Sequence, residues 1–146
     1  MSTIARRALL RGTAAIALLP LFACAQTQRS RTELEDANDA FSKAIRWGDL
    51  RGLGQRVVPD RQAEFLKLAA TNEDNLKVVD YEMQDVKVST DKAIVRSRVS
   101  WYREPSVITR TESMTVLWEQ KNGTWLIASI LGGPLPLPPL VPANPR

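Results

Sequence analysis

The spacing of apolar residues changes partway along the chain from a helical period to a strand period. Between residues 32 and 47, and again between 60 and 71, apolar residues recur three or four positions apart, as in helices with one buried face. From Leu76 onward, apolar and polar residues alternate, as in strands with one buried face. Asn122-Gly123 lies between two alternating stretches and favours a two-residue hairpin turn. The pattern predicts helices followed by four antiparallel strands.

The start of the first helix is indicated by Thr32, which has Glu35 three residues later in the spacing of a capping box. Residues 24–31 before it are polar and show no periodicity. We therefore expect the folded domain to begin at Thr32 and residues 24–31 to form a flexible tether.

The alternation predicts a distortion in the first strand and a register for the last two. Apolar residues 79–83 follow one phase and residues 86–88 follow the other, so we expect a bulge near residues 84–85. Across the hairpin turn, pairing of apolar positions places Trp118 opposite Ile127 and Val116 opposite Ser129.

Helices followed by an antiparallel meander form an α+β domain, with the helices packed on one sheet face. The element order, the bent first strand and the closing hairpin from Trp118 to Trp125 resemble the nuclear transport factor two-like superfamily. The resemblance covers residues 32–131 and implies N-terminal helices packed on a curved four-strand antiparallel sheet. No catalytic pattern of the superfamily's enzymes matches this chain residue by residue, so the resemblance implies a fold and no particular activity.

Residues 1–23 have the layout of a secretory signal peptide: arginines, an apolar run and small residues at the end. Leu21-Phe22-Ala23-Cys24 resembles a bacterial lipobox, which implies cleavage before Cys24 and acylation of that residue. Two or more acyl chains hold a protein stably on a membrane. Arg6-Arg7 resembles a twin-arginine export motif, so the general and twin-arginine export routes both stay open. Ala25 follows in place of an inner-membrane Asp signal, and by this resemblance we expect an envelope lipoprotein on the outer membrane, facing the periplasm.

Composition excludes several classes of function. The chain has no histidine and one cysteine, which excludes Ser-His-Asp and Cys-His catalysis and histidine-based zinc sites. Three of its 20 basic residues lie in residues 1–23, so 17 remain against 16 acidic residues in the rest of the chain. A chain with this nearly equal number of basic and acidic residues lacks the excess of basic side chains that nucleic-acid binding requires. We expect no metal, no cofactor and no nucleic-acid partner.

One candidate ligand site lies on the sheet face that is expected to meet the helices. Aligning Trp101 with Ile108 puts Arg110 opposite Val99 and Glu112 opposite Ser97. In a pocket, Arg110 would bind a carboxylate and a desolvated Glu112 would act as a base; on an open rim, the two would form a solvated pair. The candidate ligand-binding residues are Ser97, Trp101, Arg110, Glu112 and Ser129.

A second candidate region combines the last strand with the proline-rich tail, residues 132–146. The outer sheet face of the last strand carries an apolar strip. A second copy of the chain, an envelope protein or the tail itself would cover the strip, unless the assignment of faces is off by one residue. The tail itself, which has no capacity for a sheet ladder, suits a spacer, a strap along the domain or an extended ligand. The candidate interface residues are Leu126, Ala128, Ile130, Leu135 and Leu137.

The leading hypothesis is therefore a membrane-anchored, non-enzymatic accessory or binding domain of the bacterial cell envelope. Its partners would be the membrane, through the lipid anchor, and an envelope protein or a second copy. The alternative is a small-ligand binder or an enzyme whose cone-shaped pocket contains Arg110 and Glu112.

Overall fold

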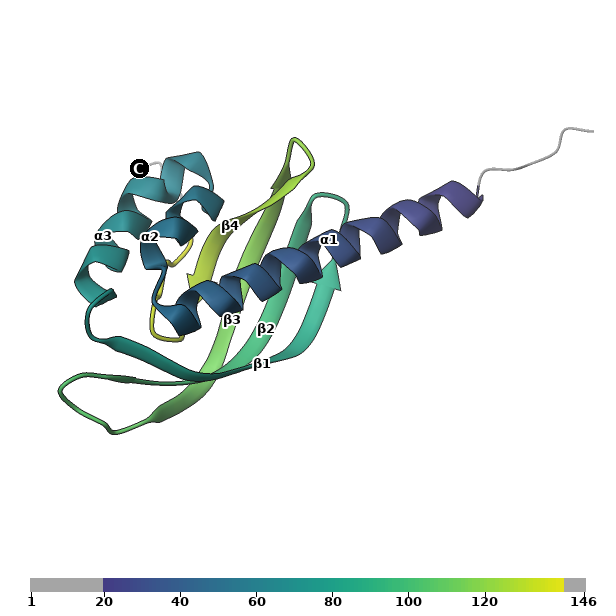
Figure 1. Cartoon of the computed structure of the whole chain (residues 1–146). Coiled ribbons are helices and arrows are strands. Elements are labelled where there is room, and N and C mark those ends of the chain that lie inside the picture. Colours follow the sequence, from purple (N-terminus) through teal and green to yellow (C-terminus); the bar gives the residue numbers. More distant parts are fainter. Residues whose placement is uncertain (1–19, 141–146) are drawn as a thin grey trace, which may run out of the picture.

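A computed structural model describes residues 20–140, which form one layer of helices over one antiparallel sheet (Figure 1). The strands are ordered β1-β2-β3-β4 across the sheet, so every strand pairs with its neighbour in sequence. The predicted α+β class with helices on a four-strand antiparallel sheet is confirmed. The elements are α1 (Pro20–Trp47), α2 (Leu50–Leu53), the short turns η1 (Gly54–Arg56) and η2 (Pro59–Arg61), α3 (Gln62–Asn72), β1 (Leu76–Val88), β2 (Lys92–Arg103), β3 (Arg110–Lys121) and β4 (Thr124–Leu131).

The core lies between α1 and the inner sheet face. Leu34, Phe41 and Ile45 follow helical spacing on α1 and are buried, so they form one apolar stripe along the helix. Phe41 meets Trp118 of β3 edge-to-face, with ring centroids 6.2 Å apart. This stripe sets how α1 crosses the sheet (Figure 1).

The first helix begins at Pro20, so the expected start at Thr32 and the expected flexible tether over residues 24–31 are wrong. Thr32 lies inside the helix, where its hydroxyl donates to the Gln28 carbonyl oxygen at 3.1 Å. Glu35 pairs with Arg31 four residues earlier rather than capping a helix end. Such i,i+4 pairs stabilise an exposed helix by about 0.2–0.5 kcal/mol each.

The first strand is distorted twice. The register between β1 and β2 shifts between Met83 and Asp85, which confirms the predicted bulge. A second shift between Val78 and Asp80 was not predicted, and it leaves Val79 52% exposed. Because each bulge adds one residue, buried Val78 and half-buried Tyr81 both face the helices.

The β3–β4 hairpin confirms the predicted turn and corrects the register beyond it. Asn122 and Gly123 have φ of 53° and 77°, as a type I′ turn requires. Trp118 pairs with Ile127 as predicted. A bulge then intervenes, and Val116 pairs with Ile130 instead of Ser129, because the extra residue turns fully buried Ile130 into the core.

The register between β2 and β3 differs by two residues from the predicted one. Arg110 pairs with Trp101 rather than Val99, and Glu112 pairs with Val99 rather than Ser97. The observed register places Ser97 opposite Met114, so that buried inner-face residues of the two strands meet.

Residues 134–138 of the tail, here named the strap, pack against β4. Leu135 and Leu137 are each 1% exposed. Leu137 and Ile130 exchange two backbone hydrogen bonds of 2.8 and 2.9 Å, so the expectation that the tail forms no ladder is wrong at this position. The buried Arg61 side chain donates to the Pro138 carbonyl oxygen at 2.6 Å and to the Ala128 carbonyl oxygen at 3.3 Å.

The strap also corrects the predicted interface. Ile130, Leu135 and Leu137 contribute to the chain's own core, because the bulge in β4 turns the first inward and the strap carries the other two back. Leu126 and Ala128 are half-buried against that core. Of the alternatives that the sequence left open for this strip, burial by the chain itself is therefore the one observed at Ile130, Leu135 and Leu137.

Candidate functional site

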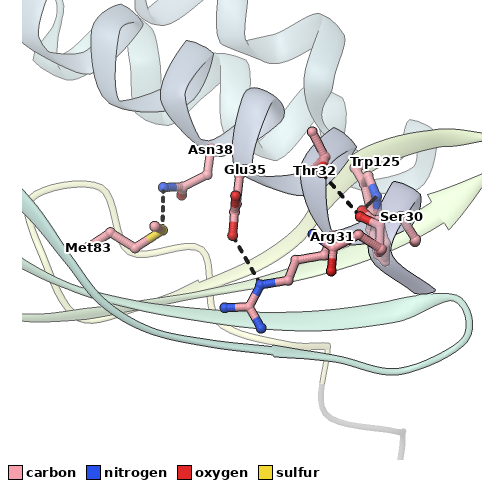
Figure 2. Close-up of polar contacts among 8 residues, drawn as sticks. Ser30, Arg31, Thr32, Glu35, Asn38, Met83 and Trp125 are labelled. Atoms are coloured by element: carbon pink, nitrogen blue, oxygen red, sulfur yellow. Dashed lines mark hydrogen bonds and ion pairs between the residues drawn. The ribbon is translucent and has the colours of Figure 1, made fainter. Parts of the chain in front are cut away.

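Beneath α1, a small polar cluster interrupts the apolar core. The Tyr81 hydroxyl donates to Asn38 Oδ1 at 2.8 Å, and Asn38 Nδ2 donates to Met83 Sδ at 3.5 Å. Figure 2 shows Asn38 on α1 joined to Met83 on the strand below it. Asn38 is only 4% exposed. Sequence reasoning missed this cluster, although Asn38 falls four residues after Leu34 on the apolar stripe, where a polar residue needs a partner.

The side chains of this cluster are uncharged and join α1 to β1 by hydrogen bonds. Burial raises the pKa of Tyr81 above its ordinary value of 10.0, and the neighbouring Ser97 and Asn38 side chains offset part of that rise. The Ser97 hydroxyl is buried and makes no hydrogen bond to any described residue. At neutral pH, Tyr81 therefore stays protonated and serves as a donor that fixes α1 to β1.

The structure separates the predicted ligand-binding residues into two groups. Ser97, Trp101 and Ser129 are buried in the core. Arg110 and Glu112 are exposed at the start of β3. The structure therefore does not enclose Arg110 and Glu112, which were expected to bind a carboxylate and to act as a base in a cone-shaped pocket.

Trp101 does bring two guanidinium groups together. The Arg103 guanidinium carbon lies 4.5 Å from the Trp101 ring centroid, and that of Arg110 lies 5.6 Å from it. Arg103 is held in place by donating to Asn72 Oδ1 at 3.0 Å and to the Pro134 carbonyl oxygen at 2.7 Å. Arg110 has no such bond to the described part of the chain, so its guanidinium remains available at the surface.

Two surface depressions lie along α1 beside the β3–β4 turn, and Arg110 lines neither of them. One, of about 340 Å³, lies between α1 and the β3–β4 turn and has Asp36, Arg56 and Trp125 in its lining. The other, of about 960 Å³, is an open groove between the first turns of α1 and the β1–β2 and β3–β4 turns. Most of its lining residues have polar side chains, among them Gln26, Arg29 and Glu33, whereas small-ligand pockets are lined mainly by hydrophobic and aromatic side chains.

Cys24 lies at this same end of the molecule, exposed on the second turn of α1. From residue 24 to 29 the helix is exposed, and it joins the body where Trp125 Nε1 donates to the Ser30 carbonyl oxygen at 3.1 Å (Figure 2). From Cys24 onward, Leu34 is the first buried residue of α1. At a rise of about 1.5 Å per residue, Cys24 lies about 15 Å along the helix from Leu34.

Among residues 20–140, no group of three or more Cys, Asp or Glu side chains is arranged to hold a metal ion. Over the same residues, every helix is either too short or too polar to cross a bilayer. Residues 1–19 of the signal-like segment, which include the twin arginines, lie outside the described residues.

No protein-family model matches the chain, and no curated protein matches it. Among solved structures, the chain is similar to a SEC-C motif containing protein from Rhodopseudomonas palustris, with a TM-score of 0.55 and 10% identity over 63% of this chain and 72% of that one. It also matches a candidate isomerase from the same organism, with a TM-score of 0.39 and 18% identity over 44% of this chain and 48% of that one. A third match is a candidate NTF2-like transpeptidase from Campylobacter jejuni, with a TM-score of 0.43 and 19% identity over 64% of this chain and 94% of that one.

At these identities the likeness concerns the fold alone. The arrangement expected from the resemblance to the nuclear transport factor two-like superfamily, helices first and then a bent antiparallel meander, is the one observed.

Proposed function

We propose that this chain is a lipid-anchored, non-enzymatic binding domain of the bacterial cell envelope, held on the outer membrane and facing the periplasm. The observation that carries the proposal is the lipobox-like Leu21-Phe22-Ala23-Cys24 segment, whose cysteine is exposed on a helix that runs into the core. In this proposal, acyl chains on Cys24 are joined to the body by helix, and the body projects from the bilayer surface.

A binding role is favoured over catalysis by the side chains that the fold leaves accessible. The chain has no histidine. Tyr81, whose pKa is raised, stays neutral near pH 7 and hydrogen-bonds within the core. Arg110 and Glu112 are both exposed, so neither side chain is desolvated in the way that would tune its pKa for acid–base chemistry. The alternative of a pocket enzyme that uses this pair therefore finds no support in the geometry.

The anchor is tested by Cys24→Ser in the full-length chain, expressed in a Gram-negative host. We expect the unaltered protein to sediment with outer membranes and its N-terminal peptide to carry acyl chains on Cys24 by mass spectrometry. The Cys24→Ser protein should lose those chains and either leave the membrane fraction or remain as an uncleaved precursor. Gln26→Ser, two residues away and also exposed, is the matched control and should behave as the unaltered protein.

An unmodified Cys24 on a mature protein in the soluble fraction would refute the anchor. Acylated protein in the inner membrane would refute only the proposed outer-membrane location.

A further inference from the structure

The first part of β3 has a free edge. β4 pairs with β3 only from Thr115 onward, where Thr115 faces Leu131. β2 occupies the other side of β3 as far as Arg110. Within residues 20–140, no strand or backbone hydrogen bond covers the outer edge of Arg110–Glu112. Alternate N–H and C=O groups on an uncovered edge can pair with another strand.

The side chains along this edge are exposed and carry opposite charges. Residues 110–113 are all exposed, so neither sheet face is covered there. Arg110 and Glu112 are two residues apart and therefore share a face. Neither forms an ion pair with any described residue, whereas Arg98 pairs with Glu82 at 2.8 Å on the opposite sheet face.

The neighbouring loop adds apolar surface. Val107 and Ile108 are 78% and 75% exposed. The loop between β2 and β3 extends past the helical layer, at the end of the molecule where α1 ends (Figure 1). A strand arriving at the edge would meet these side chains without obstruction from the helices.

We propose that this edge pairs with the same edge of a second copy of the chain. An antiparallel pairing about a two-fold axis at Thr111 places Arg110 opposite Glu112 of the second copy, and Glu112 opposite Arg110. Both ion pairs lie on one face, and Thr111 faces its own copy on the other. Because a basic residue at position 110 is followed by an acidic residue at position 112, the edge is complementary to a second copy of itself. Because the ladder is short, the dimer is weak and forms at high local concentration.

Charge reversal tests this register. Sedimentation velocity is measured on residues 24–146 with Cys24→Ser, a chain that contains every buried residue of the core and carries no lipid. Arg110→Glu places two acids opposite each other, and Glu112→Arg places two bases. Each alone should lower the association constant about tenfold, since like charges directly opposite are destabilising.

Mixing the two variants should restore association, because the acid introduced at position 110 of one chain then faces the base introduced at position 112 of the other. The double variant should recover it as well. Arg96→Glu, on an exposed β2 residue paired with Thr115, is the matched control and should leave association unchanged.

A disulfide provides a second readout. In the Cys24→Ser chain, Thr111→Cys should form an intermolecular disulfide under mild oxidation, because residue 111 lies on the two-fold axis. Thr115→Cys, on the same sheet face but covered by β4, should not. A chain that stays monomeric at millimolar concentration, or variants that fail to restore association when mixed, would overturn the proposal. Because these chains lack the anchor, neither outcome bears on lipidation.

Discussion

Leu137→Ala tests whether the strap is part of the folded core. The Leu137 side chain is 1% exposed, and its backbone pairing with Ile130 is retained by alanine, so the substitution removes only buried apolar atoms. Leu→Ala substitutions in cores cost about 2–5 kcal/mol. Because the strap is a short terminal segment that can adjust around the cavity, we expect about 2–3 kcal/mol here.

The assay is urea unfolding followed by tryptophan fluorescence, with the unaltered chain and Leu137→Ala measured side by side. With an m value of about 1–3 kcal/mol/M, the expected loss lowers the midpoint by about 1–2 M. Leu140→Ala is the matched control, since Leu140 follows in the same segment but is 64% exposed. It should change the midpoint by less than about 0.3 M.

Equal midpoints for Leu137→Ala and the unaltered chain would mean that the strap is not docked in solution. Equal losses for Leu137→Ala and Leu140→Ala would mean that the segment packs differently from the arrangement described above.

Two further predictions concern ionisable groups. Tyr81→Phe should lower the free energy of unfolding by about 1–3 kcal/mol, because buried Asn38 Oδ1 loses its donor; Tyr102→Phe, which breaks no hydrogen bond seen in the described chain, should not, in the same urea assay. Since the pKa of Tyr81 is raised in the folded state, the stabilisation is complete below pH 10 and is lost as pH rises through the folded pKa, which absorbance titration would locate above 10.0. The pKa of Glu73 is lowered from 4.5, first by its hydrogen bonds from Arg51, so its contribution is present at neutral pH and is lost as pH falls through that lower pKa. Carboxyl NMR should place the Glu73 pKa below 4.5 and show that it rises in Arg51→Ala; an unchanged pKa would contradict the ion pair.

Strand positions were predictable where the apolar pattern changes phase, and unpredictable where it does not. The bulge near Gln84 could be read because valines after it follow the opposite alternation. The bulge beside Val79 could not, because Val78 and Val79 are both apolar and either one fits the inner face. In β4 the run from Trp125 to Leu131 is apolar at nearly every position, so nothing in it marked the residue at which Ile130 turns inward.

The start of α1 shows a different limit. Thr32 and Glu35 fit a capping box, but their side chains equally suit i,i+4 contacts within a continuing helix, which is how the structure uses them. Of the candidate site, sequence correctly grouped Arg110 with Trp101 on one face. It missed that the helical layer ends before Arg110 and leaves the pair exposed, because the length of a helix layer over a sheet is a tertiary property.

Because the strap lies near the end of the chain, the core can be completed only late in synthesis. Leu135 and Leu137 leave the ribosome after all four strands, yet they fill space beside Ile130 that belongs to the core. A nascent chain in which both hairpins have formed therefore still lacks the strap beside β4. Folding that begins with the N-terminal part is complete only when the strap docks. For the export proposed above, the machinery would therefore meet an open intermediate during translation or a closed domain after release.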